Sequence, residues 1–548
     1  MVETLHASIP RLSAERRVLL VSAAVAGLAA LLLLVVVPVG GDASAHLYRT
    51  LLVQRGALIW DNLWFAGQYP LVSYSLLYYL PAAVVGNGTL ATAAVILSAL
   101  LFASLVLPVY RAKAARWPSY CFAAVVGGQF FTGDYPYTMG FAALLATLWA
   151  LQRGRTWLAL ICAALTLGCS PLAFLFLCLT LFALWISSSQ PRKRTLVVGG
   201  ALALLAALEL GALRLFHSRS LYYPFDIWRF LLGVPVGVIG AALAFRSREA
   251  RPLASIFVVW TLATVAAYLT PSPVGHNLLR PATLVFPLML LVAVLAGFRP
   301  RWLAYPAVVI SFAANVGPYV ATAVSRTDPA SKASFWEPLL RYAATHSSAN
   351  YRLEVVPTIN HWESYYVPKA GFPIARGWYQ QLDTADYPRI NRSRLTARVY
   401  REWLRSVGVR YVIAAHVTPG AEATAEARLL ASGRSGLVRV FESRSGSVYE
   451  LPGPQAILTG PGPAGIARMG ISSIAGWTSR PGNYLLRVHY TSLWKVKLGA
   501  LCLRPGPGGM TMVGVWRAGR FMLQAVEEPG AAVALILDRD RETTRACA

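Results

Sequence analysis

The sequence predicts a polytopic α-helical membrane protein that carries a large folded domain outside the membrane. Only 14% of the 548 residues are charged and 56% are hydrophobic, whereas about a quarter of an average soluble domain is charged. Long apolar runs fill residues 18–323, and residues 324–548 have the mixed composition of a soluble domain. We therefore expect two modules, a helical bundle and a C-terminal domain.

The first apolar run, residues 18–39, begins directly after Arg16 and Arg17. A run of about 22 residues can cross a hydrocarbon layer of about 30 Å, and it is longer than the apolar core of a cleaved signal peptide. We interpret it as a retained first helix that follows a cytoplasmic segment, residues 1–17.

Basic residues cluster in short loops between the apolar runs, which is typical of cytoplasmic loops. The clusters are Arg111, Lys113 and Arg116, then Arg192, Lys193 and Arg194, and then Arg246, Arg248 and Arg251. Placing them all inside the cell predicts about eleven transmembrane helices, at residues 18–39, 89–109, 117–132, 136–152, 155–169, 171–187, 195–216, 227–244, 252–270, 279–298 and 302–323. Residues 40–88 then form a long first outer loop, and the C-terminal domain lies outside the plasma membrane. Within the loop, Leu71–Val85 is apolar and rich in Tyr, so we expect an interfacial or re-entrant segment there.

The C-terminal domain divides into a mixed α/β section, residues 324–454, and a β-rich section, residues 455–548, that resembles a small sandwich or jelly roll in its spacing of Gly and Pro. The expected helices are Phe335–Thr345 and Arg394–Ser406, and the expected strands are Arg352–Val356, Val409–Ala414, Leu437–Phe441, Tyr484–Tyr490 and Ala531–Leu537. Two of the six cysteines, Cys502 and Cys547, lie in this domain, and the sequence does not decide whether they pair.

The net charge of +26 would suggest nucleic acid in a soluble chain. Here much of the excess belongs to the cytoplasmic loops, and the arginines of the C-terminal domain suit anionic lipid or glycan. The eight histidines lack the spacing of zinc ligands, and the chain has neither a phosphate-binding glycine loop nor a serine nucleophile elbow. We expect membrane lipid among the partners and no nucleic acid.

Asp42 is the first candidate for chemistry, because it stands just past the end of the first helix, at the outer face. If the chain continues as a helix, Asp42, His46 and Arg49 share one side of it. Charged groups close to the membrane are costly and usually have a role. The alternative is that Asp42 only caps the N-terminus of the next helix.

Three further aspartates fall in outer loops. Asp134 follows a glycine in a short hairpin, where it is a candidate second acid or metal ligand beside Asp42, or else a helix cap. Asp226 has Arg229 three residues later, so we expect a local ion pair. Asp61 lies between Trp60 and Trp64, in a stretch that we interpret as amphipathic and interfacial.

Basic residues at the outer face form a second set of candidates, because they break the rule that positive charges stay inside. The set comprises Arg214, His217, Arg219, His276 and Arg280. A lipid-linked phosphate would explain them, and so would ordinary contacts with lipid headgroups.

The first loop also carries a longer motif. It reads Asp42-x3-His46, Gly56-Ala57-x2-Trp60-x3-Trp64-x2-Gly67-Gln68-x-Pro70 and Tyr74-x3-Tyr78-Tyr79-x-Pro81. This motif resembles the opening of a bacterial membrane family often labelled 6-pyruvoyl-tetrahydropterin-synthase-related, over about residues 18–140. That family is similar to the GT-C class of lipid-dependent glycosyltransferases. Its label does not fit this chain, because pterin synthase chemistry needs a zinc held by clustered histidines.

The resemblance implies a GT-C-like bundle and an inverting glycosyltransferase that takes a sugar from a polyprenyl-phosphate donor at the outer leaflet. In that class an Asp directly after the first helix activates the acceptor, and Asp42 matches this position. Asp134 matches loosely a second acidic site of some members, and Arg280 matches weakly a donor-phosphate residue. Metal dependence stays open, so a divalent cation is a candidate cofactor.

From these residues we expect Asp42 to be catalytic and His46 to orient it or to touch the acceptor. Arg280 and His276, with His217 and Arg219, would bind the donor phosphate. Tyr74, Tyr78 and Tyr79 would form a lid beside the acceptor, and the outer domain would bind an envelope glycan.

Two other classes of function remain open. A lipid or polysaccharide transporter would carry ionisable residues through the middle of the bundle, where Glu209 and Arg214 are candidates, and it often shows a repeated half. A non-catalytic membrane scaffold that binds envelope glycan would tolerate the loss of Asp42.

Overall fold

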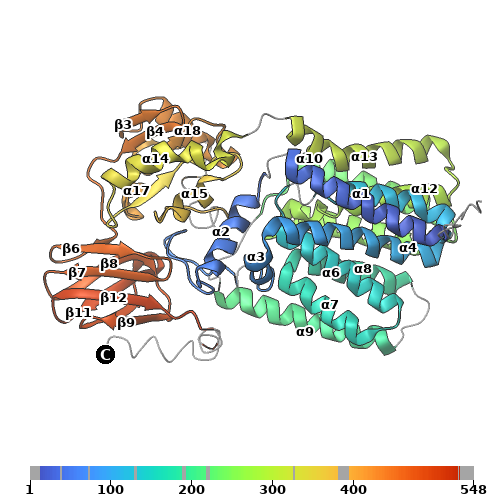
Figure 1. Cartoon of the computed structure of the whole chain (residues 1–548), viewed down its shortest axis with the longest axis horizontal. Helices are drawn as coiled ribbons and strands as arrows, with labels where there is room; N and C mark the ends of the chain where they lie inside the picture. The colour runs from blue at the N-terminus through green and yellow to red at the C-terminus, as the bar shows by residue number, and fades with distance from the viewer. Residues whose placement is uncertain are drawn as a thin grey trace, which may run out of the picture.

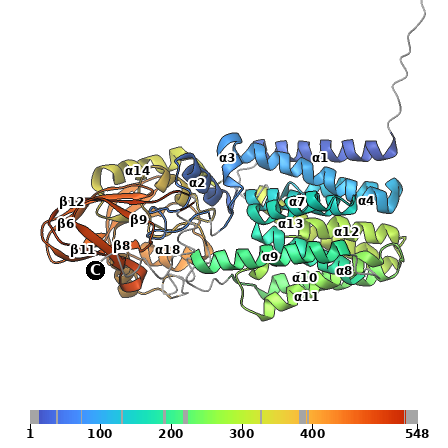
Figure 2. The same ribbon diagram turned by 90° about the horizontal axis from the view of Figure 1, so that it is seen from below.

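The chain consists of a bundle of long helices and a C-terminal half built mainly of β-strands, as the computed structural model shows (Figure 1). The structure describes residues 13–36, 40–71, 74–128, 132–187, 193–216, 223–324, 328–379, 390, 394–528 and 530. Helix α2 lies where the two halves meet, in both views of the chain (Figures 1 and 2). The expected division into a helical and a β-rich part is confirmed.

The helices of the bundle follow the predicted apolar runs to within several residues. They are α1 (Ala14–Val36), α4 (Asn87–Val125), α6 (Tyr135–Gln152), α7 (Thr156–Cys169), α8 (Pro171–Ser187), α9 (Lys193–Phe216), α10 (Ile227–Phe245), α11 (Arg251–Leu269), α12 (Ala282–Leu295) and α13 (Arg301–Val324). A short 3₁₀ turn, η1 (Gly275–Leu279), precedes α12. Five segments of the described chain are long and apolar enough to cross a membrane.

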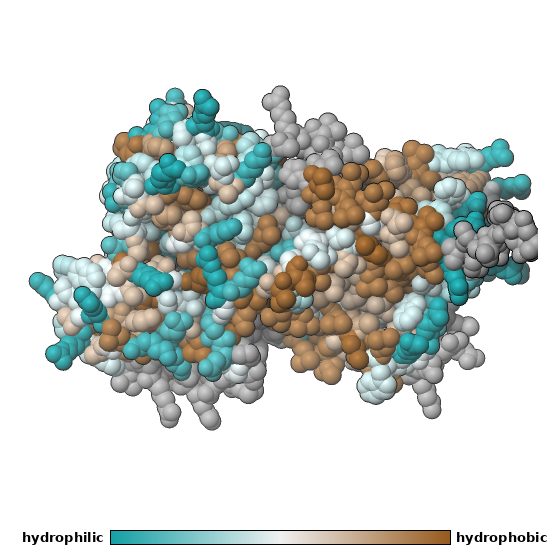
Figure 3. All heavy atoms as spheres, viewed as in Figure 1, coloured by the Kyte–Doolittle hydropathy of each residue, from teal (hydrophilic) through white to brown (hydrophobic). Residues whose placement is uncertain are grey.

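These five segments fit a membrane protein, and so does the surface. Hydrophobic residues gather over the helical half, and hydrophilic residues cover much of the C-terminal half (Figure 3). The predicted number of spans and their orientation across the membrane stay predictions.

The long element α4 contains two of the predicted spans. Arg111 has left-handed backbone angles (φ 58°, ψ 158°) that interrupt the helix. The rings of Phe102 and Phe122 stack 4.3 Å apart, although residues so far apart on a straight helix would be separated by about 30 Å. The chain therefore reverses at Arg111, and the basic loop that we expected at residues 111–116 is reduced to this sharp turn.

The first outer loop is folded into the protein. It contains α2 (Ala43–Gln54) and α3 (Tyr79–Val85), joined by a segment in which Asp61 and Gln68 exchange backbone hydrogen bonds. Trp60, Asp61 and Trp64 are at most 1% exposed. The interpretation of this stretch as amphipathic and interfacial is wrong, because protein rather than lipid covers it.

The loop is covered by the C-terminal half of the chain, through hydrogen bonds to both of its sections. Trp64 Nε1 donates to the Ser364 carbonyl, and the amide of Ile374 donates to the Leu63 carbonyl. Gly377 lies so close to the Trp64 indole that a Cβ there would come within 2.4 Å of it. On the other side, Glu527 accepts from two amides of the loop.

The mixed section after the bundle is built on a four-stranded sheet in the order β1-β2-β4-β3. Its strands are β1 (Arg352–Val355), β2 (Val409–Ala415), β3 (Val438–Ser443) and β4 (Gly446–Glu450), and its helices are α14 (Ala333–His346), α15 (Glu363–Lys369), α17 (Ala397–Ser406) and α18 (Thr424–Ala431). Strands β1 and β2 run parallel. The helices and strands expected here are confirmed.

The β-rich section forms two four-stranded antiparallel sheets, in the orders β10-β11-β8-β5 and β6-β7-β12-β9. The strands are β5 (Leu458–Thr459), β6 (Ala464–Met469), β7 (Ser473–Thr478), β8 (Gly482–His489), β9 (Trp494–Leu498), β10 (Leu501–Pro505), β11 (Met510–Val515) and β12 (Gly519–Ala525). The predicted strand Ala531–Leu537 lies outside the described residues. Cys502 is disulfide-bonded, and Cys547 also lies outside the described residues.

A buried ionic cluster holds the segment around Arg376 in place. This segment continues to Gly377, which packs against Trp64 of the first outer loop. Arg376 is 3% exposed and forms ion pairs with Glu354 of β1 and Glu426 of α18. Tyr400 donates to the second oxygen of Glu426. Burial raises the pKa of Glu354 to about 8, although the charge of Arg376 opposes this.

We expect the stability of the Glu354→Gln variant, relative to that of the wild type, to increase as the pH rises toward 8. The folded-state pKa of about 8 lies above the unfolded value of about 4.3, so wild-type folding loses at most about 1.4 kcal/mol per pH unit between these values. Glutamine avoids this loss. Thermal unfolding of the full-length protein at pH 5, 6.5 and 8 measures the difference.

The control is Glu337→Gln, because Glu337 is exposed and pairs with Arg341 on the surface of α14. This variant should track the wild type at every pH. A difference between Glu354→Gln and the wild type that does not change with pH would contradict a proton on Glu354.

Candidate active site

The candidate site forms where α2 begins, against the hairpin that precedes α6. The amide of Asp42 donates to the Thr132 carbonyl over 3.1 Å. Gly133 has a φ of +82°, and a Cβ there would lie 2.4 Å from the Ala43 nitrogen. Glycine therefore permits a close approach that brings Asp42 next to Asp134.

The two aspartates are joined by Arg280, which follows η1. Nη2 of Arg280 lies 3.1 Å from Oδ2 of Asp42, and Nη1 forms an ion pair with Oδ1 of Asp134. Nε of Arg280 donates to the side chain of Asn277 over 2.9 Å. Three segments that are far apart in the sequence thus supply one cluster.

Neither aspartate acts as a helix cap through its side chain. Asp42 and Asp134 occupy the N-cap positions of α2 and α6, but neither carboxylate accepts a capping hydrogen bond. The capping alternative is therefore wrong for both. The carboxylates contact Arg280 instead, which leaves them available for chemistry.

The pKa values of the two carboxyl groups are shifted in opposite directions. Burial raises the pKa of Asp42, but a hydrogen bond with Asp134 and the charge of Arg280 outweigh burial and hold it below its usual range. Burial drives the pKa of Asp134 well above its usual range. Asp134 is therefore the member of the pair that takes up a proton first, and Asp42 the member that stays ionised, as expected for two carboxyl groups in contact.

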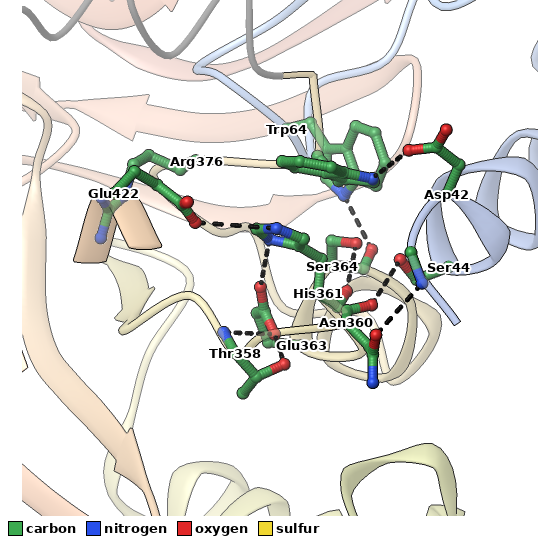
Figure 4. Close-up of polar contacts among 12 residues, drawn as sticks. Asp42, Ser44, Trp64, Thr358, Asn360, His361, Glu363, Ser364, Arg376 and Glu422 are labelled. Carbon is green, nitrogen blue, oxygen red and sulfur yellow. Dashed lines mark hydrogen bonds and ion pairs between the residues drawn. The ribbon is translucent and has the colours of Figure 1, made fainter. Parts of the chain in front are cut away.

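The C-terminal half of the chain completes the surroundings of Asp42. Trp378 Nε1 donates to Oδ1 of Asp42 over 3.2 Å. The side chain of Asn360 accepts from the amide of Gly41, and its carbonyl accepts from the hydroxyl of Ser44 (Figure 4). These contacts fix the start of α2 against the mixed section.

A histidine stacks on the face of the Trp378 indole. The rings of His361 and Trp378 are nearly parallel, and their centres are 3.4 Å apart. His361 is 4% exposed and has a φ of +54°. Glu363 lies 3.3 Å from one ring nitrogen and Glu422 3.6 Å from the other (Figure 4). This layer positions the indole that holds Asp42.

One helical turn after Asp42 lies a group of aromatic and basic side chains. His46 Nδ1 is 2.8 Å from the Tyr79 hydroxyl, and its ring lies 5.1 Å from that of Tyr74. The Arg49 guanidinium lies over the rings of Tyr74 and Tyr379, at 4.8 and 5.5 Å from their centres. Burial lowers the pKa of His46 to about 3, so its imidazole is neutral.

The structure thus brings together Asp42, Asp134 and Arg280, with His46, Tyr74 and Tyr79 on the adjacent turn. Tyr78 instead donates to Asn87, in a buried network with Thr50. His276 faces the Pro224 carbonyl and the Tyr223 ring. His217 and Arg219 lie outside the described residues.

Asp226 and Arg229 form the local ion pair that their spacing predicts, 3.2 Å apart, and Asp226 also caps α10. Within the described chain, no three or more His, Cys, Asp and Glu side chains gather in a way that could hold a metal ion. The role of a divalent cation stays an open prediction.

An apolar groove lies beside Arg280, between α6, α8, α11 and α12. Pro281, the residue after Arg280, is among its lining residues, which are apolar except for Thr180. The groove is therefore suited to a hydrocarbon chain rather than to a sugar.

Sequence reasoning missed the residues that the C-terminal half contributes, Trp378, Tyr379, Asn360 and His361. They follow α14 in a stretch with little regular secondary structure, so no periodicity marks them. The one local signal is Gly377-Trp378-Tyr379, a glycine before two large aromatic residues, which is typical of a backbone packed closely against another element.

The charge assignment predicts unequal effects of removing the two carboxylates. We expect Asp42→Asn to destabilise the protein by about 1–3 kcal/mol, because Arg280 loses its ionised partner. Asp134→Asn should cost less than about 1 kcal/mol, because an amide replaces a carboxyl group that is already neutral. Thermal or denaturant unfolding at pH 7 measures both. Equal losses would contradict the assignment of the proton to Asp134.

Comparisons with known proteins identify no family for this chain. No protein-family model matches it, and no curated protein matches its sequence. Among solved structures, the oligosaccharyltransferase of Archaeoglobus fulgidus in its apo form is similar with a TM-score of 0.45 and 13% sequence identity. The similarity covers 73% of this chain and 69% of that one. A likeness at this level does not assign a function.

Proposed function

We propose that this protein is an inverting glycosyltransferase that moves a sugar from a polyprenyl-phosphate donor to an envelope acceptor at the outer face of the membrane. The observation that carries the proposal is the position of the Asp42 carboxylate. It is held by Arg280 and Trp378 where the bundle meets the C-terminal half. The resemblance of the first loop to that of lipid-dependent glycosyltransferases supports the same reading.

In the proposed reaction the acceptor hydroxyl attacks C1 of the sugar. The bond between C1 and the phosphate oxygen breaks, and the polyprenyl phosphate leaves with the electron pair. Asp42 accepts the hydroxyl proton as the new bond forms. In glycosyl transfer the sugar carries much positive charge in the transition state, so a carboxylate of low basicity is sufficient to orient and deprotonate the hydroxyl.

The neighbouring groups set the protonation state and the orientation of the Asp42 carboxylate. Arg280 and the Trp378 indole each bind one of its oxygens, so the carboxylate keeps one orientation. A single proton on Asp134 prevents repulsion between two charged carboxylates. An oriented general base contributes roughly 10²–10⁴-fold to the rate.

The helical half of the molecule suits the lipid-linked donor, and the C-terminal half suits the acceptor. We infer that the apolar groove between α6, α8, α11 and α12 takes the prenyl chain of the donor, since its lining includes Pro281, the residue after Arg280. The C-terminal half, which is largely hydrophilic at its surface (Figure 3), would bind the acceptor glycan. Asp42 lies between them, where a sugar attached to a membrane lipid would meet an acceptor from outside.

The test is transfer of radiolabelled sugar from a panel of polyprenyl-phosphate sugars to a cell-envelope extract by the purified full-length protein. We expect Asp42→Asn to lose 10²–10⁴-fold in rate. Because the pKa of Asp42 lies below its usual range, the wild-type rate should stay level as the pH falls from 7 to about 5.

The matched control is Asp226→Asn, because Asp226 is a solvent-exposed aspartate outside the cluster. It should transfer at the wild-type rate. No transfer by the wild type from any donor, together with equal glycan binding by Asp42→Asn, would favour a non-catalytic scaffold and reject the proposal.

A further inference from the structure

We propose that Arg49, together with Nε2 of His46, forms the site that binds the phosphoryl group of the lipid-linked substrate. This inference rests on the proposed function for the identity of the ligand, but its geometry is independent of it. It differs from the sequence-based prediction, in which Arg280 and nearby basic residues were expected to hold the phosphate.

The first observation is a buried positive charge without a counter-ion. Arg49 is 1% exposed, and it forms no ion pair within the part of the chain that the structure describes. Its Nε and Nη2 atoms have no hydrogen-bond partner. Removing a charge from water without such partners is costly, and an anionic ligand would offset this cost.

Arg280, the other arginine near Asp42, differs from Arg49 in its partners. It is also largely buried, but it pairs with Asp42 and Asp134 and uses its Nε on Asn277. Its charge is therefore already balanced by the ionised Asp42. A phosphate that bound Arg280 would compete with the base, whereas Arg49 has unused donors and no carboxylate to displace.

The second observation is a histidine nitrogen without a partner beside Arg49. The Tyr79 hydroxyl lies 2.8 Å from Nδ1 of His46, and the charge of Arg49 lowers the pKa of this hydroxyl against the effect of burial. Nε2 of His46 is buried and has no hydrogen-bond partner. When the Tyr79 hydroxyl donates to Nδ1, the proton of the neutral imidazole is on Nε2.

Three unused donors therefore lie on one side of α2: Nε and Nη2 of Arg49 and Nε2 of His46. The two residues are three positions apart, so their side chains are neighbours on the helix surface. An array of N–H donors without acceptors is what a phosphate oxygen requires, and arginine binds phosphate through two parallel hydrogen bonds.

The position of this array fits the chemistry at Asp42. Arg49 and Asp42 are separated by about 10 Å along the helix. That spacing leaves room for an acceptor hydroxyl at Asp42, the sugar, and the leaving phosphate at Arg49. The guanidinium is covered by the rings of Tyr74 and Tyr379, which are themselves in edge-to-face contact. Entry of the phosphate requires these rings to turn aside.

The experiment measures binding of geranyl phosphate, a short polyprenyl phosphate, to the full-length protein in nanodiscs of neutral lipid. We expect Arg49→Gln to weaken binding at least tenfold. The control is Arg55→Gln, because Arg55 ends the same helix and is exposed, with one contact to the Lys369 carbonyl. It should bind as the wild type does.

Stability separates a ligand site from a structural role. An arginine that holds the fold together would lower the melting temperature when it is replaced. A buried arginine without a counter-ion should leave it unchanged or raise it in Arg49→Gln without ligand. In the wild type, geranyl phosphate should also slow amide hydrogen exchange in residues 43–54, and this readout does not depend on any variant.

Each result supports or rejects the site. Unaltered binding by Arg49→Gln, or no protection of residues 43–54 in the wild type, would reject it. Equal competition by phosphatidylglycerol would also reject it, because the anion would then be an ordinary headgroup. If Arg49→Gln transferred sugar at the wild-type rate, the phosphate site would be rejected and the proposed function would stand. If the wild type bound geranyl phosphate through Arg49 but transferred no sugar, the site would stand and the proposed function would be rejected.

Discussion

The burial of the first outer loop against the C-terminal half is the constraint on which the site depends. A loop that places Trp60 and Trp64 inside the protein must also satisfy its own backbone groups there. Glu527, Ser364 and the Ile374 amide supply partners for that purpose. Because α2 belongs to the same loop, the position of Asp42 follows from how well the two halves of the chain fit together.

This arrangement explains why the cluster draws on such distant segments. The bundle alone would provide Asp42, Asp134 and Arg280, with the glycine at position 133 allowing the close approach. The C-terminal half adds the Trp378 indole and, behind it, His361. The buried Arg376 pairs fix the backbone two residues before the indole. A change that weakens the packing between the two halves would therefore displace the Asp42 carboxylate before it disturbed the core of either half.

Hydropathy and charge predicted the helices well, since both depend on local composition, and even the reversal at Arg111 falls inside a predicted loop. The importance of Asp42 also followed from its place after the first helix. Its partner Arg280, more than two hundred residues away, was only a candidate for another role. Trp378 and His361 could not be predicted, because their contacts arise from packing between modules. The lipid-facing interpretation of Trp60 failed for the same reason: an aromatic stretch looks alike whether lipid or protein covers it.

Two arginines near Asp42, the buried Arg49 and the partly buried Arg280, differ in their partners. Of the two, the sequence made only Arg280 a candidate phosphate ligand, because it lies at the outer end of an apolar run. The structure separates them by their partners. Arg280 is part of a cluster whose charges already cancel, so it serves to hold Asp42 ionised and oriented. Arg49 has aromatic rings as neighbours and donors without acceptors. A protein that keeps such a charge buried loses stability for it, and the simplest physical reason to retain it is an anion that arrives with the substrate.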